Sequence, residues 1–136
     1  MMVSTFLMFN GDCEEAIRFY EKAFGVKATN VMRYSEAPPS ADFKAPAGTE
    51  NYIMYSQLKL GGTPIMLGDT TPDWKTSFGS GMSITITLDS PEKVKTLFNA
   101  LKEGGKITME PQETFWSKLF GSLEDRFGVS WMISVE

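Results

Sequence analysis

FLMFNGDCEEAIRFYEKAFG (Phe6–Gly25) is the stretch of sequence that decides the fold. It overlaps an apolar run, Val3–Phe9, which predicts a β-strand. A short polar turn follows, and Cys13–Phe24 then has the pattern of an amphipathic helix. Its apolar side chains recur at helical spacing and form one stripe: Ala16, Ile17, Phe19, Tyr20, Ala23 and Phe24. The stretch therefore predicts a strand that leads through a tight turn into a helix packed on a sheet.

Both ends of this helix have recognisable signals. Asp12 is a preferred N-cap residue, and Glu15 stands at the third helical position, as in a capping box. Gly25 follows the last apolar position and predicts a left-handed C-cap. We therefore expect the helix to begin at Cys13 and to end at Phe24.

The rest of the first half reads as three further strands. A strand is predicted from about Val26 to Tyr34, and a polar, proline-containing loop from Ser35 to Glu50. Strands at about Asn51–Leu60 and Thr63–Leu67 are separated by Gly61-Gly62, a pair typical of a two-residue hairpin turn. Residues 1–69 are thus predicted to form one βαβββ module.

The second half repeats that order. Met82–Leu88 alternates apolar and hydroxyl side chains, as a half-buried strand does. Ser90 and Pro91 are typical of a helix start, and Gly104-Gly105 of its end. The predicted apolar face of this helix is Leu97, Phe98 and Leu101, and the predicted later strands lie near Lys106–Glu110, Thr114–Leu123 and Val129–Val135. We expect a single α+β domain over 1–136, with module two at about 80–136.

Two such modules are expected to form a partial barrel around a cleft, with the helices outside. The alternation in Met82–Leu88 indicates which side chains face which way. Ile84, Ile86 and Leu88 are predicted to pack on the helix, whereas Ser83, Thr85 and Thr87 are predicted to line the cleft.

Composition excludes several classes of function. The chain has 136 residues and a formal net charge of −4, and it has no cluster of basic residues of the kind that nucleic acid binding requires. No apolar run approaches the roughly 20 residues of a membrane helix, and the N-terminus lacks the features of a signal peptide. One cysteine permits no internal disulfide, so a cytoplasmic location is expected. The absence of histidine removes the commonest metal ligand and general base.

Three ordered segments resemble one family. They are FLMFNGDCEEAIRFYEKAFG (Phe6–Gly25), the hairpin LKLGGTPIMLGD (Leu58–Asp69), and FWSKLFGSLEDRFGVSWMIS (Phe115–Ser134). Together they resemble the PhnB-like proteins of the vicinal oxygen chelate superfamily, which has the glyoxalase/bleomycin resistance/dioxygenase fold. These proteins are often labelled as relatives of a demethylubiquinone methyltransferase. We discount that activity, because no Gly-rich turn after a strand provides a nucleotide site.

The resemblance implies where a metal would be held. Four inward positions bind the ion in the metal-using members of the superfamily, and they fall here on Thr5, Met66, Ser83 and Met132. Neutral hydroxyls and thioethers are poor ligands for hard or borderline divalent ions, so no metal and no cofactor are expected. Tyr55 stands where PhnB-like proteins often have a histidine.

We therefore expect a metal-free protein that binds a small apolar or aromatic molecule, with catalytic residues unknown. The resemblance also implies a homodimer. Two alternatives stay open: an enzyme of the same superfamily, metal-dependent or assisted by Tyr55, and an interaction subunit that uses Trp74. The residues expected to line the cleft are Thr5, Leu7, Tyr55, Met66, Ser83, Thr85, Trp116, Ser130 and Met132.

Two further side chains have competing interpretations. Cys13 lies in a first helical turn, where a thiol can be activated, although a small buried side chain is the commoner case. The run Glu124–Arg126 reads as a solvated turn, with a catalytic carboxylate as the alternative.

Overall fold

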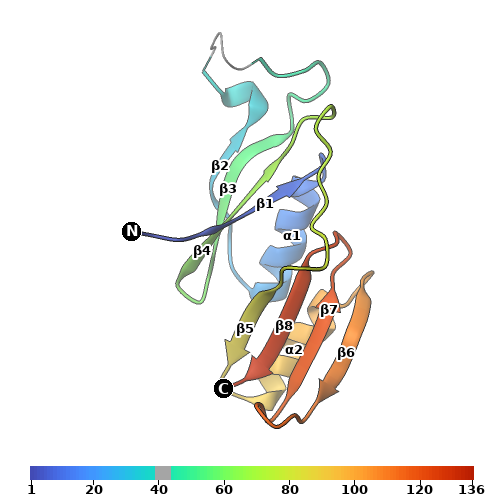
Figure 1. Cartoon of the computed structure of the whole chain (residues 1–136). Coiled ribbons are helices and arrows are strands. Elements are labelled where there is room, and N and C mark those ends of the chain that lie inside the picture. Colours follow the sequence, from blue (N-terminus) through green and yellow to red (C-terminus); the bar gives the residue numbers. More distant parts are fainter. Residues whose placement is uncertain (39–43) are drawn as a thin grey trace. The chain divides into compact units, whose positions relative to one another are not determined.

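The computed structural model describes residues 1–38 and 44–136, and the chain divides into two compact units, Met1–Thr76 and Ser77–Glu136. Among the described residues, each unit has one α-helix and one four-stranded sheet (Figure 1). The elements of the first unit are β1 (Thr5–Phe9), α1 (Cys13–Phe24), β2 (Thr29–Arg33), the 3₁₀ turn Tyr34–Glu36, β3 (Ile53–Leu60) and β4 (Thr63–Asp69). Those of the second are β5 (Ile84–Leu88), α2 (Pro91–Leu101), β6 (Lys106–Gln112), β7 (Phe120–Glu124) and β8 (Ser130–Val135).

The two units share one topology. The strand order is β1-β4-β3-β2 in the first sheet and β5-β8-β7-β6 in the second. The first strand of each unit runs parallel to the last, and the other pairs are antiparallel. The predicted α+β class and the repeated βαβββ order are therefore confirmed. The predicted module limits, 1–69 and 80–136, fall inside the two units; that both form one domain around a cleft stays a prediction.

Helix α1 has the predicted limits, but its N-terminus is held differently. Gly25 adopts the left-handed conformation (φ 67°) and donates its N–H to the Glu21 carbonyl, as predicted for a C-cap. The predicted cap by Asp12 is wrong, because its side chain makes no capping hydrogen bond. The Cys13 N–H is instead bound by Asp69 Oδ1 at 3.0 Å. The first turn is thus capped from the end of β4.

Helix α2 begins as predicted. The Ser90 side chain accepts a hydrogen bond from the Lys93 N–H, and Pro91 occupies the first helical position, where its missing donor costs nothing. Its buried face is Val94, Leu97, Phe98 and Leu101. Across 1–38 and 44–136, no helix has both the length and the apolar character needed to cross a membrane.

Several predicted strands begin later than expected, and in two of them local hydrogen bonds compete with the sheet. Residues before β2 bind the end of α1: the Ala28 N–H donates to Glu21 Oε2, so the strand begins at Thr29. In the predicted strand Thr114–Leu123, the observed strand β7 begins only at Phe120. Thr114 and Ser117 bind each other through backbone and side chain and form a turn instead. Residues 39–43 of the predicted Ser35–Glu50 loop lie outside the described residues.

The hairpin between β3 and β4 has the predicted turn. Gly61 (φ 55°) and Gly62 (φ 87°) both have positive φ, which a type I′ turn requires and which a side chain would strain. Because this turn fixes the register, Leu58 lies opposite Ile65 and Gln57 opposite Met66.

Each unit has its own apolar core between helix and sheet. In the first, α1 packs against β3 and β4 and buries Ile17 and Tyr20 with Leu58 and Leu67. In the second, α2 packs against β5, β7 and β8, and Trp131 is the largest fully buried side chain. One face of each sheet is therefore covered by its own helix, and the other face is the place to look for function.

Candidate functional site

The face of the first sheet turned away from α1 is defined by strand register. Leu7 lies opposite Leu67 and is buried, whereas Phe6 lies opposite Met66 and is 41% exposed. Successive side chains of a strand point to opposite faces. The face away from α1 is called here the open face, and its register positions are Phe6, Met8, Thr29, Met32, Tyr55, Gln57, Lys59, Pro64, Met66 and Gly68.

The register places the predicted ligand residues of the first unit on opposite faces of its sheet. Tyr55 and Met66 lie together on the open face, as expected. Thr5 and Leu7 pair with Ile65 and Leu67 and point to the face that α1 covers. The expectation that Thr5 shares an inward surface with Met66 is therefore at variance with the register, because a shift of one residue moves a side chain to the other face. Contact of any of these residues with a ligand stays a prediction.

Phe6 and Met8 are the open-face residues of β1 that the sequence analysis missed. The Phe6 and Tyr55 rings lie 6.3 Å apart at 52°, an ordinary tilted aromatic contact. Gly68 lies directly next to the Phe6 ring on the open face. A Cβ at Gly68 would lie 3.3 Å from Phe6 Cε1 and 2.7 Å from the Met54 carbonyl oxygen, so no larger residue fits there. The result is a half-exposed surface of rings and thioethers.

The second sheet has a different open face. Thr85 lies opposite Met132, and Ser130 follows the same parity, so these three predicted residues share the face away from α2. Ser122 also lies opposite Met132, and its hydroxyl is 2.7 Å from that of Thr108. Met109 lies opposite Ser122 as well, so this face carries hydroxyls around two thioethers, whereas the first is largely aromatic and apolar.

Two predicted residues of the second unit lie outside its strands. Ser83 precedes β5, which begins at Ile84. Trp116 lies in the Thr114–Ser117 turn and is 55% exposed, with its ring 5.4 Å from Phe120 and 4.7 Å from Phe115. Trp116 also lines a shallow surface pocket with Glu113, Thr114, Phe115, Ser117, Lys118 and Glu136.

The buried carboxylate Asp69 joins three segments of the first unit. Its Oδ1 accepts from Gly11 N–H (2.9 Å) and Cys13 N–H (3.0 Å), and its Oδ2 accepts from Ile53 N–H (2.9 Å). Burial raises the pKa of Asp69 above its usual range, and the three amide hydrogen bonds oppose that shift. Asp69 therefore fixes the β1–α1 turn to the start of β3.

Burial also decides between the two interpretations of Cys13. The thiol is completely buried, and burial followed by the charge of Asp69 raises its pKa far above the usual range. A nucleophilic thiol needs the opposite environment. Cys13 is a core residue.

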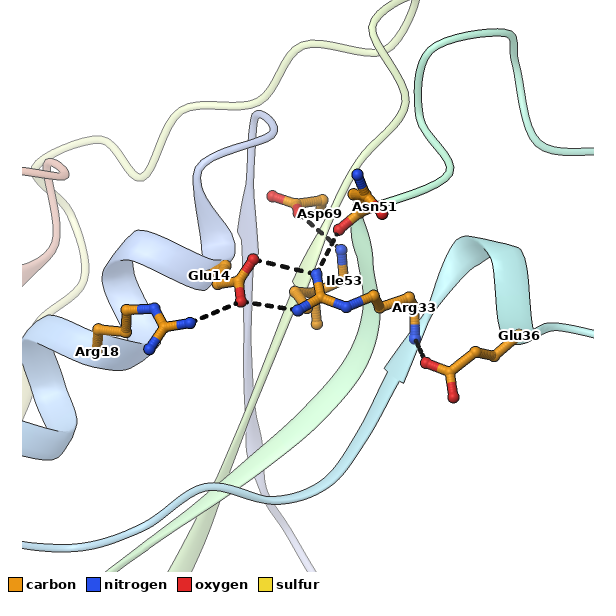
Figure 2. A network of polar contacts seen from close by, with 7 residues as sticks. All are labelled: Glu14, Arg18, Arg33, Glu36, Asn51, Ile53 and Asp69. Atoms are coloured by element: carbon orange, nitrogen blue, oxygen red, sulfur yellow. Dashed lines mark hydrogen bonds and ion pairs between the residues drawn. The ribbon is translucent and has the colours of Figure 1, made fainter.

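The exposed polar network on α1 is held by Glu14. Figure 2 shows its carboxylate between Arg18 and Arg33, with both Arg33 η-nitrogens bound to it at 3.1 and 2.7 Å. Arg33 also donates to the Asn51 carbonyl at 2.8 Å, which ties β2 to the segment before β3. The hydrogen bonds from Arg33 hold the pKa of Glu14 below its usual range. One carboxylate is bound by two guanidinium groups from α1 and β2, and all three side chains have partners, so the network is a structural brace.

Asp125 differs from the predicted solvated turn. It is 3% exposed, and its Oδ1 accepts from the Phe127 and Val129 N–H groups at 2.9 and 3.1 Å. Its Oδ2 accepts from Trp131 Nε1 at 2.8 Å. The carboxylate holds the β7–β8 turn and anchors the buried Trp131, and both of its oxygens accept hydrogen bonds from the protein itself.

The carried-over metal positions offer a poor ligand set. Thr5 and Ser83 provide neutral hydroxyls, and Met66 and Met132 provide thioethers, which hard or borderline divalent ions do not favour. Within 1–38 and 44–136, no three His, Cys, Asp or Glu side chains gather in a group able to hold an ion. The residues present do not fit the metal of the superfamily.

The doubled βαβββ order, with one helix on one face of each sheet, places the chain in the vicinal oxygen chelate class. A family model described as 3-demethylubiquinone-9 3-methyltransferase matches residues 1–134. The chain belongs to this family, that of the PhnB-like proteins.

Three relatives show how close the likeness is. Protein YjdN of Escherichia coli K12 is 36% identical over 99% of this chain and 95% of its own length. The structure of PA1353 from Pseudomonas aeruginosa has a TM-score of 0.88 at 34% identity, over 100% of this chain and 98% of that one. A protein of Bacillus cereus described as a putative 3-demethylubiquinone-9 3-methyltransferase, PhnB protein, has a TM-score of 0.83 at 31% identity, over 100% of both chains.

Proposed function

We propose that this chain binds a small, flat, largely apolar molecule without a metal ion, on the open face of the first sheet. The observation that carries the proposal is the gathering of Phe6, Tyr55 and Met66 around Gly68. Rings and thioethers that stay half exposed lose contact with water when a flat ligand covers them, and that burial supplies affinity.

The family description alone does not support methyl transfer by this chain. A nucleotide cofactor in a doubly wound fold is held by a Gly-rich turn between a strand and a helix. Here the β1–α1 turn is Asn10-Gly11-Asp12 and the β5–α2 turn is Asp89-Ser90. The proposal therefore stays with binding and includes no reaction.

The test is a thermal-shift screen of aromatic compounds, since a ligand of the native state raises the unfolding midpoint by mass action. Phe6→Ala should remove the shift given by a hit, because it takes away a ring of the open face. Thr5→Ala is the matched control: it changes the neighbouring side chain, which points to the other face, and should leave the shift intact. Loss of the shift in Thr5→Ala alone would contradict the choice of face.

The proposal includes a homodimer in the cytoplasm, as the family resemblance implies. Light scattering of the eluting protein should give twice the 15.2 kDa chain mass. Trp74 is 72% exposed and is the side chain through which an interaction subunit would act. A dimer that survives Trp74→Ala argues against the interaction role for that loop, and a dimer that dissociates favours it.

A further inference from the structure

The open face carries one polar side chain whose orientation the fold sets, and this is Gln57 on β3. It lies opposite Met66, and therefore on the same face as Tyr55 two residues earlier. Asn30 Nδ2 donates to Gln57 Oε1 at 3.0 Å. With its oxygen engaged by Asn30, the Gln57 amide has both N–H donors of Nε2 left for other acceptors.

The backbone of β2 is bent at the residue that makes this contact. Asn30 has φ 53°, and it is the non-glycine residue with positive φ within 1–38 and 44–136. The β2–β3 register shifts between Thr29 and Met32, as at a β-bulge. Bulges re-aim side chains, and positive φ in a residue with a side chain is concentrated where function over-determines the backbone. The bulge brings the Asn30 amide to Gln57.

The surroundings of Gln57 favour an acceptor. No residue among 1–38 and 44–136 receives a hydrogen bond from its Nε2. Lys59, two residues along β3, is exposed on the same face, and no carboxylate stands at any register position of that face. In a chain of net charge −4, this surface is therefore locally donor-rich and positive.

We propose that Gln57 determines specificity on the open face by donating a hydrogen bond to a carbonyl or carboxylate oxygen of a flat aromatic ligand. The ring of the ligand lies against Phe6 and Tyr55, and Lys59 favours the carboxylate over the neutral carbonyl. Asn30 is a positioning residue that fixes which end of the Gln57 amide faces the ligand. This inference rests on the proposed function and adds the polar group that the ligand must have.

The test compares three probes that share one naphthalene ring: 2-naphthoate, the neutral ketone 2-acetonaphthone, and 2-naphthylmethylammonium. Their dissociation constants are measured by NMR titration of ¹⁵N-labelled protein, with the Gln57 side-chain amide as reporter. The two acceptor probes should bind about tenfold more tightly than the ammonium probe, which corresponds to about 1.4 kcal/mol. They should also shift the Gln57 amide signal.

Two variants test the amide directly. Gln57→Glu keeps the shape but replaces the donor, so the preference should reverse toward the ammonium probe. Asn30→Asp cannot donate to Gln57, which then donates to the new carboxylate and presents its oxygen instead. Binding of the neutral ketone should weaken in Asn30→Asp, and because the ketone has no charge, repulsion by the new carboxylate does not explain that loss. Lys59→Met should reduce the advantage of naphthoate over the ketone.

The outcomes separate this inference from the proposed function. If all three probes bind equally, Gln57→Glu changes none of them and Phe6→Ala weakens them all, the open face binds ligands but Gln57 does not select them. That result overturns the inference alone. If no naphthalene probe shifts any signal of the open face, both the inference and the proposed function are wrong.

Discussion

Replacement of Asp69 gives a graded loss of stability that can be worked out from its two oxygens. In Asp69→Ala, three N–H donors lose their acceptor, and those of Cys13 and Ile53 are buried. An unsatisfied buried donor costs about 1–3 kcal/mol, so two of them should cost about 2–6 kcal/mol. In Asp69→Asn, the side-chain oxygen still serves Gly11 and Cys13, and only Ile53 N–H faces the new NH₂ group. That variant should lose about 1–3 kcal/mol, roughly half of the alanine effect.

The assay is urea denaturation followed by far-UV circular dichroism, with free energies extrapolated at a common slope. Asp12→Ala is the matched control. If Asp12 were the cap of α1, its loss would cost about 1 kcal/mol. Since its side chain makes no capping bond, we expect the midpoint to stay near that of the wild type. The reasoning is refuted if Asp12→Ala costs more than Asp69→Asn, or if Asp69→Asn and Asp69→Ala are equally costly.

Three further predictions concern buried groups. Because burial raises the pKa of Asp69 above the ~3.9 of an unfolded Asp, the part of the stability that depends on its protonation is complete below about pH 3.9 and is lost as pH rises through the raised value, while the hydrogen bonds from the three amides remain. Denaturation at a series of pH values should show this decline in the wild type and not in Asp69→Asn. Asp125→Asn keeps the acceptor for Phe127 and Val129 but turns an NH₂ group toward Trp131 Nε1–H. It should cost about 1.5–3 kcal/mol and alter tryptophan emission; unchanged stability would deny the anchoring role. Cys13 should resist a thiol reagent in the native state and react only in denaturant, whereas rapid native labelling would show that the thiol is accessible.

The helix α1 could be predicted to the residue because its signals are local. Its apolar stripe and the glycine after it both lie within the helix and its flanks. Its cap could not be found in this way. The acceptor, Asp69, stands at the end of β4, and only the parallel pairing of β1 with β4 brings it to the turn. Asp12 has a residue type typical of an N-cap and stands at the N-cap position, but the carboxylate of Asp69 accepts the hydrogen bond from the first turn of the helix.

Strand faces were predictable only where the sequence marks them. In β5 (ITITL), apolar and hydroxyl residues alternate, and Thr85 lies on the face predicted for it. In β1 (TFLMF), four of the five residues are apolar, so the pattern does not say which parity faces the helix. The family resemblance placed Thr5 on the inward face, and Leu7 was expected to line the cleft with it, whereas the register with β4 gives that face to Phe6.

The same limit explains why Gln57 and Asn30 were missed. A glutamine between Ser56 and Leu58 has no motif around it, and the asparagine that orients it is separated from it by a loop and most of a strand. Their contact depends on a left-handed backbone at Asn30 inside a bulged strand, which propensity alone does not predict. Asparagine adopts this conformation more readily than most residues, so the residue type is compatible with the bulge but does not predict it. Polar groups that orient one another across strands are therefore the part of the proposed site that only the folded register reveals, and in the proposed role they select among apolar ligands.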